Sequence, residues 1–282
     1  MTDPVAAVTE TEASGETAAI FTDIRSVYGV SVVNLIWRHL ATFPGALPWA
    51  WGTVRPLYIG GAIAREAAGL RVARRLPSLP PVPREVFTAM GLTRDDLRQI
   101  GVVLDAYERT NPMALVALSV LRQSLAAPAR IDGGAETWTP RTEESDPEPR
   151  LPPLPPLLQL DQMAPAVADL VLMLNRIGAA RSDPILASMY RNLAHWPRYL
   201  ALAWMMLAPL EDAGVLAGPI RDIGAEAIAR ARTIAPRGPA SGPALPVEQR
   251  AEVAAAIERF AGDAICRMVL ICGTLRNAGL GV

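Results

Sequence analysis

The stretch IWRHLATFPGALPWAWGTVRPL, residues 36–57, occurs a second time in this chain as MYRNLAHWPRYLALAWMMLAPL, residues 189–210. Both copies place an aromatic residue, an arginine, a Leu-Ala pair, an aromatic-proline pair and a tryptophan at the same spacings. Proline fixes its own φ and pushes the residue before it out of the helical region. Each copy therefore predicts a helix, a short break at Pro44 or Pro197, and a second helix.

An alignment of the two copies without gaps supports an internal duplication. Of the 21 positions that start at Trp37 and Tyr190, nine are identical, whereas chance in an Ala- and Leu-rich chain gives about two. A weaker pairing, residues 115–122 with residues 268–276, falls at almost the same offset. We expect two tandem helical repeats that pack as a pseudo-dimer, with a central cleft where a ligand can bind.

The rest of the chain also has a helical composition. Residues 93–110 carry apolar side chains on one stripe, with Thr93 as the predicted N-cap. Residues 246–276 begin with Pro246 as a predicted first-turn residue and become apolar on most of the helix circumference, which is typical of a central helix. No alternating strand pattern is longer than residues 29–33. The predicted fold class is all-α.

Composition divides the chain into four parts. Residues 1–20 are acidic and rich in small side chains, which predicts a disordered N-terminus. Residues 127–156 contain Gly, Pro and acids with almost no apolar periodicity, which predicts a Pro-rich linker. The flanking parts, residues 21–126 and 157–282, are then the two helical repeats.

Charge and apolar content exclude several classes of partner. The 282 residues are 51% hydrophobic and carry a net charge of -1, and the basic residues are all arginine. Neither nucleic acid nor an anionic membrane surface is an expected partner, and lysine chemistry is excluded.

No apolar run reaches the ~18 residues of a membrane span, and no signal peptide is visible. Cys266 and Cys272 match no metal or redox spacing, so we expect buried free thiols in a cytoplasmic protein.

Several segments together resemble a known family. They are DIRSVYGV (23–30), WRHLATFPGALPWAW (37–51), YERTNPMALVALSVL (107–121) and SMYRNLAHWPRYL (188–200). The chain resembles the group I, DehI-type 2-haloacid dehalogenases, all-α proteins of two repeats joined by a Pro-rich linker. The resemblance implies hydrolysis of short 2-halocarboxylic acids by an activated water, without an ester intermediate and without a metal or organic cofactor.

The resemblance also implies site residues. Water attack needs a carboxylate base, an amide that holds the water or the base, a donor for the substrate carboxylate and an apolar slot. The asparagine of the family's Asn-Pro element matches Asn111, and the serine beside the family's base matches Ser188. Met189, which cannot accept a proton, stands where the aspartate base is expected.

Two other carboxylates are candidate replacements for that base. A Ser-Asp dipeptide upstream offers Asp183, although its place before Pro184 also predicts an N-cap of the following helix. Family members carry a threonine and a glutamate at positions that match Gly60 and Ala64, and Glu66 lies close to them. The candidate catalytic residues are Asp183, Asn111 and Glu66.

The repeat itself points to a substrate-binding set. An arginine pair at equivalent positions can bind a carboxylate bidentately, or alternatively cover the last carbonyl groups of its own helices. The neighbouring aromatic residues suit either an apolar ligand or the core. The candidate binding residues are Arg38, Arg191, Trp37, Tyr190, Ser188 and Met189.

A metal site is not expected. His39 and His195 are the only histidines, and neither belongs to a cluster of acids, whereas a protein metal site usually has three or four ligands. A half-buried, hydrogen-bonded role is predicted for both.

Three functions remain open at this point, and the third, a purely structural interaction module, rests only on the Pro-rich linker. The first is hydrolytic dehalogenation of a 2-haloacid, with Asp183 or Glu66 as the base and Asn111 assisting. The second is a non-dehalogenase relative that binds a small apolar carboxylic acid or a protein partner in the cleft between the repeats. A homodimer is compatible with either of the first two.

Overall fold

The computed structural model describes residues 5–126, 150–235 and 243–279, and every regular element in these ranges is a helix. The all-α prediction is therefore confirmed. The first half of the chain forms α1 (Gly15–Tyr28), α2 (Leu35–Leu40), α3 (Ala46–Ile59), α4 (Ala62–Ala73), α5 (Arg84–Ala89) and α6 (Arg94–Ala126). The second half forms η1 (Leu160–Gln162), α7 (Pro165–Arg176), α8 (Ser188–Leu193), α9 (Pro197–Asp212), α10 (Ala217–Ile234), η2 (Val247–Gln249), α11 (Arg250–Arg259), η3 (Phe260–Ile265) and α12 (Cys266–Asn277).

Both copies of the quoted motif form a short helix, a break and a longer helix. In the first copy α2 ends at Leu40, and Gly45 turns the chain into α3 with a positive φ of 72°. In the second copy α8 ends at Leu193, and Pro197 is the first residue of α9. Proline is tolerated there because the first N–H groups of a helix have no intrahelical acceptor.

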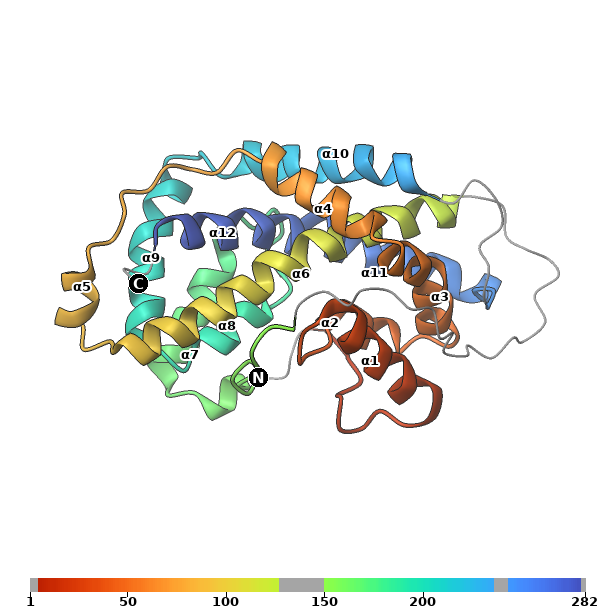
Figure 1. The fold of residues 1–282 in the computed structure, drawn as a ribbon, viewed down its shortest axis with the longest axis horizontal. Coiled ribbons are helices and arrows are strands. Elements are labelled where there is room, and N and C mark those ends of the chain that lie inside the picture. The colour runs from red at the N-terminus through yellow and green to blue at the C-terminus, as the bar shows by residue number, and fades with distance from the viewer. Residues whose placement is uncertain (1–4, 127–149, 236–242, 280–282) are drawn as a thin grey trace.

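Helix α6 lies at the centre of the molecule. It packs against α4 of the first half and against α10 and α12 of the second half, while α4 and α10 also pack on each other. Figure 1 shows α1, α2 and α3 at one end of the molecule and α7, α8 and α9 at the other, with α6 and α12 crossing between them. The two halves are therefore interlocked.

The predicted N-cap of α6 is confirmed. The helix predicted for residues 246–276, in contrast, begins later than expected and is interrupted. The Asp96 N–H donates to Thr93 Oγ1 (3.1 Å), and the Thr93 N–H donates back to Asp96 Oδ2 (2.8 Å). Pro246, expected in a first helical turn, instead precedes η2, so that α11 begins at Arg250. A π-helical turn, η3, then separates α11 from α12.

The prediction of a disordered N-terminus is wrong for the described residues 5–20. Val5 is buried, and the Val8 N–H donates to the Arg38 carbonyl (3.0 Å). The Val33 N–H donates to Glu10 Oε1 (2.9 Å), and α1 begins at Gly15. The segment is held by a backbone hydrogen bond to α2 and by the Glu10 side chain, which accepts from a backbone N–H just before α2.

The expected linker, residues 127–156, lies largely outside the described residues, which resume at residue 150. The Leu151 N–H donates to the Gly29 carbonyl (2.9 Å), and Asn192 Nδ2 donates to the Pro155 carbonyl (2.8 Å). The end of this segment thus contacts both halves of the chain.

Two further findings concern the core and the helix lengths. Cys266 and Cys272 are buried free thiols, as predicted. Among the described helices, none is by itself long and apolar enough to cross a membrane; α9 and α10 meet these criteria only as a pair, bent by 92°.

Candidate functional site

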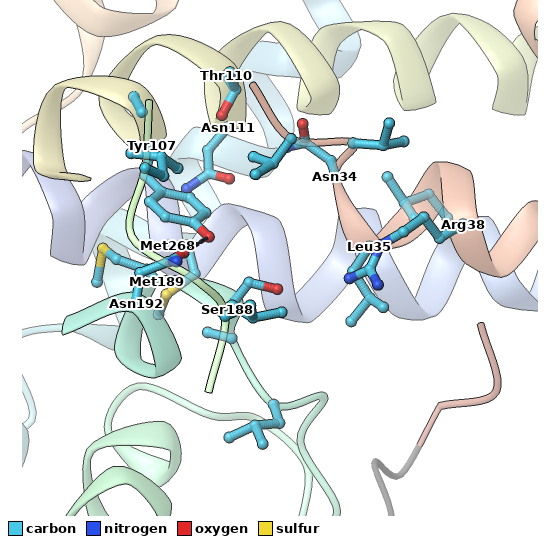
Figure 2. A pocket seen from close by; sticks show the side chains of 18 of the residues that line it. Asn34, Leu35, Arg38, Tyr107, Thr110, Asn111, Ser188, Met189, Asn192 and Met268 are labelled. Carbon is cyan, nitrogen blue, oxygen red and sulfur yellow. Dashed lines mark hydrogen bonds between the residues drawn. The ribbon is translucent and has the colours of Figure 1, made fainter. Parts of the chain in front are cut away.

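A cavity of about 640 Å³ lies where segments of both halves meet. Its wall combines residues 30–38 around the start of α2, the middle of α6, the start of α8, and residues near the η3–α12 junction. Residues 9–11 of the N-terminal segment and residues 154–162 close to η1 complete it. Figure 2 shows side chains from these separate elements converging on one space.

Helices α6 and α8 contribute a hydrogen-bonded group of polar side chains to the wall. Tyr107 Oη donates to Asn192 Oδ1 (2.7 Å), and the Asn192 amide in turn donates to the Pro155 carbonyl (2.8 Å). Asn111 is 6% exposed, and its Nδ2 has no hydrogen-bond partner among the described residues. Figure 2 shows Asn111, Tyr107 and Ser188 facing the same space. A buried, unsatisfied amide donor is costly, so a ligand oxygen at Asn111 would be stabilised.

Tyr107 is a hydrogen-bond donor rather than a base at neutral pH. Burial raises the pKa of its hydroxyl well above the usual range, and Arg38 and Arg191, which favour the ionised form, offset this only in part. Desolvation disfavours the phenolate because a charged group loses more hydration than a neutral one.

The apolar part of the wall includes Met189, whose side chain is fully buried, and Met268, which is 4% exposed. Methionine fills irregular apolar space and cannot accept a proton from water. The position that the family resemblance assigns to a base therefore contributes packing surface to the cavity.

Two charged side chains line the cavity among the described residues, Arg38 and Glu10. Arg38 extends from α2, and Figure 2 shows it beside Leu35 on the side opposite Met189. Glu10 accepts a hydrogen bond from Arg25 on one carboxylate oxygen and from the Val33 N–H on the other. Its carboxylate is thus already used to anchor the N-terminal segment.

The two carboxylates expected to replace the base lie outside this cavity wall. Asp183 is exposed and forms ion pairs with Arg181 and Arg259, each at 3.1 Å. It does not cap α8, because that helix begins at Ser188 with Ala187 as its N-cap. Glu66 on α4 pairs with Arg230 on α10 at 3.2 Å. The structure therefore brings neither carboxylate to Asn111.

The expected binding residues are divided between the cavity and the core. Ser188, Met189 and Arg38 line the cavity. Arg191 is 2% exposed and its Nε donates to the Leu158 carbonyl (2.8 Å), which removes it from the wall. Trp37 and Tyr190 are fully buried in the core, where Trp37 Nε1 donates to the Tyr28 hydroxyl (3.2 Å).

Both histidines have hydrogen-bond partners, as predicted, but His195 is exposed, so the prediction that it is half-buried is wrong. His39 Nδ1 lies 2.6 Å from the Ala6 carbonyl oxygen, and burial lowers the pKa of its ring. His195 Nε2 lies 2.8 Å from the Pro156 carbonyl oxygen. In the part of the chain that the structure describes, no group of three or more His, Cys, Asp or Glu side chains is arranged to hold a metal ion.

Three wall residues were missed by the sequence reasoning. Tyr107 lies one helical turn before Asn111, and this i, i+4 spacing was the available signal. Asn192 aligns with His39 in the duplicated motif. Because both residues are polar, the alignment gave only a weak signal that Asn192 belongs to a site. Glu10 lies in a segment expected to be disordered, and nothing in the sequence separated it from its acidic neighbours.

Comparisons with known proteins agree with this architecture. No family model matches the chain. A configuration-inverting 2-haloacid dehalogenase of Alcaligenes xylosoxydans xylosoxydans is 30% identical over 206 residues, which cover 72% of this chain and 68% of the relative. An (R)-2-haloacid dehalogenase of Pseudomonas putida is 24% identical, with 79% and 74% covered.

Solved structures give the same result for the fold. A D-2-haloacid dehalogenase in complex with L-LA superposes with a TM-score of 0.75 at 20% identity, covering 98% of this chain and 96% of the other. A mutant of a D-2-haloacid dehalogenase in complex with D-2-CPA gives a TM-score of 0.74 at 20% identity, covering 99% and 96%. With the sequence relatives and the segments around Asn111 and Ser188, these matches place the chain in the DehI-type family of 2-haloacid dehalogenases.

Proposed function

We propose that the cavity binds a small apolar 2-substituted carboxylic acid, and that the native chain releases halide from such an acid only weakly. The first part is supported by the curated relatives, which are named for their action on 2-haloacids. It is also supported by a wall that combines an unsatisfied amide at Asn111, the Arg38 cation and apolar side chains. Such a wall suits one anionic group on an otherwise apolar molecule.

The observation that carries the second part is Met189. Water attack on a carbon–halogen bond needs a group that takes a proton from water in the transition state, and such a base contributes roughly 10²–10⁴-fold in rate. The thioether of Met189 cannot do this, and the ion pairs of Asp183 and Glu66 give those carboxylates other roles. Binding is therefore retained in this proposal, while activation of water is weakened.

The test is to supply the missing base. A Met189→Asp variant would place a carboxylate on the cavity wall, and Met189→Asn is the matched control of the same shape without a base. Halide release from racemic 2-chloropropionate at neutral pH should be at least about 100-fold faster in Met189→Asp than in either the native chain or Met189→Asn. Circular dichroism of all three proteins checks that each is folded. A native rate equal to that of Met189→Asp would contradict the proposal.

A second candidate is hydrolytic dehalogenation by the native chain with Glu10 as the base. The observation that favours it is the position of Glu10, the single acid among the described residues that line the cavity. This candidate requires substantial halide release by the native protein and its loss in Glu10→Gln. In our first proposal, Glu10→Gln leaves an already low rate almost unchanged.

We also propose that the two halves arose from one duplicated unit and form a pseudo-dimer. The nine identities between the motif copies support this, as does the shared order of α2–α3–α4 and α8–α9–α10. The packing of α4 on α10 is the contact expected when equivalent helices meet near a pseudo-two-fold axis.

A further inference from the structure

The cavity is much larger than a three-carbon acid. Its volume is about 640 Å³, whereas 2-chloropropionate fills on the order of 100 Å³, about three times the ~30 Å³ that one water occupies in the liquid. Cavities between roughly 300 and 1,000 Å³ are those in which proteins bury ligands of drug size. A three-carbon acid would leave most of this space to water.

The additional space is bounded mainly by apolar side chains. Polar residues from other segments, such as Asn34 and Gln159, also line the cavity, but its wall includes Val32 before α2, Leu157 before η1, Ile185 before α8 and Phe260 in η3. These four residues come from separate segments, so the apolar surface is not confined to one helix. Water against such a surface is readily displaced by an alkyl or aryl group.

We propose that the ligand is a 2-substituted carboxylic acid with an alkyl or aryl group of about six to ten carbon atoms, a size that fits a cavity of this class. This inference rests on the proposed function and adds the substrate class. The carboxylate and the 2-substituent occupy the region of Arg38, Asn111 and Ser188, and the apolar group fills the remaining volume.

The expected effect on affinity follows from apolar burial. Each methylene transferred from water into the cavity increases the association constant up to about fourfold. Five additional methylenes therefore give a large gain, and ordering of the flexible chain offsets part of it. We expect at least a ~30-fold gain between a three-carbon and an eight-carbon acid on this basis.

Isothermal titration calorimetry of the full-length protein tests this with 2-hydroxy acids, which carry no halide to lose. The ligands are lactate, 2-hydroxyhexanoate and 2-hydroxyoctanoate, with octan-1-ol as a probe that lacks the carboxylate. The dissociation constant should fall along the acid series by at least ~30-fold, and octan-1-ol should bind more weakly than 2-hydroxyoctanoate. Equal or weaker binding of the eight-carbon acid would overturn this inference and leave the proposed function intact. Absence of binding by all three acids, or octan-1-ol binding as tightly as the eight-carbon acid, would overturn both.

Two tryptophan variants test whether the apolar group of the ligand lies in this cavity. Leu157→Trp adds bulk to a half-buried wall residue, and it should reduce the ratio of eight-carbon to three-carbon affinity at least about tenfold, since it removes space for several methylenes. Val72→Trp is the control, because Val72 is 87% exposed on α4 and outside the cavity. The affinity ratio should be unchanged in Val72→Trp. An equal drop in both variants, or none in Leu157→Trp, would contradict the assignment of the tail to this cavity.

Discussion

Two arginines at equivalent positions of the duplicated motif have different environments. Arg38 is half-buried on the cavity wall, whereas Arg191 is almost fully buried and donates to the Leu158 carbonyl. The difference arises because the segment before η1 packs on α8, while the N-terminal segment packs on α2. Equivalence in sequence predicted similar local structure at both sites, but it could not predict what each side chain contacts.

The sequence also could not predict what the candidate carboxylates contact. Asn111 and Ser188, which the family resemblance selected, both line the cavity, while their roles in catalysis and binding stay predictions. Asp183 lies in an irregular segment between α7 and α8, where no periodicity fixes the direction of a side chain. Its ion pair with Arg259 depends on α11, which is distant in the sequence.

Buried tyrosine hydroxyls provide a prediction at the residue scale. Tyr107→Phe removes the donor to Asn192 Oδ1 and leaves a buried acceptor without its partner, which should cost about 1–3 kcal/mol of unfolding free energy. Tyr190→Phe is the matched control, because the buried Tyr190 hydroxyl has no hydrogen-bond partner among the described residues. Removal of the Tyr190 hydroxyl should leave the unfolding free energy unchanged or increase it.

Urea unfolding of both variants measures this difference. In the double variant Tyr107→Phe/Asn192→Ala, the two losses should not add, because each single change removes the same hydrogen bond. Additive losses, or equal destabilisation by Tyr107→Phe and Tyr190→Phe, would contradict a structural role for the hydrogen bond.

Helix α6 illustrates what was predictable at the scale of an element. Its N-cap, Thr93, was predictable because the hydrogen bonds of the cap involve only neighbouring residues. Its length was not, because Pro112 lies inside the helix and such a residue usually ends or kinks it. Residues 110–121 are all buried, and packing on every side keeps them helical through the proline.

The first turn of α6 also gives a prediction about pH. Asp96 accepts hydrogen bonds from the Thr93 hydroxyl (2.7 Å) and N–H (2.8 Å), and from Trp196 Nε1 of the second half (2.9 Å). The hydrogen bonds from Thr93 are the main cause that lowers the pKa of Asp96 below 3.8, its value without such partners. A carboxyl group with a lowered pKa stabilises the native state above its unfolded-state pKa, and this contribution is lost as the pH falls below it.

Asp96→Ala should therefore cost about 1 kcal/mol at pH 7, as expected for a lost cap. The difference from the native chain should shrink as the pH falls below 3.8 and through the lowered native-state pKa of Asp96, because the carboxyl group is then protonated in both states. Asp95→Ala is the control in the same turn, because Asp95 forms only an exposed ion pair with Arg98 and should cost less than about 0.5 kcal/mol. Urea unfolding at several pH values checks this; a loss for Asp96→Ala that is independent of pH would show that its charge is not involved.

For the molecule as a whole, the sequence predicted two helical halves but not how they interlock. The clue to a central helix was the nearly uniform apolar character of residues 266–275, all of which are buried in α12. The partner of that helix, α6, belongs to the other half; it also contacts α8, and its first turn accepts a hydrogen bond from Trp196, the residue before α9. Pairings of this kind depend on the complementary shapes of distant segments, which no local pattern encodes.

The interlocking predicts that neither half is stable alone. A chain of residues 1–126 would expose the α6 surface that α10 and α12 cover, and a chain of residues 150–282 would expose the buried face of α12. Apolar surfaces of that extent cause aggregation or loss of fixed packing. When the two halves are produced together, each should cover the exposed surface of the other. We expect the pair to elute from size exclusion as a one-to-one complex with cooperative thermal unfolding, whereas each half alone should aggregate or unfold without a cooperative transition. A single half that is monomeric and unfolds cooperatively would show that α6 and α12 do not depend on each other.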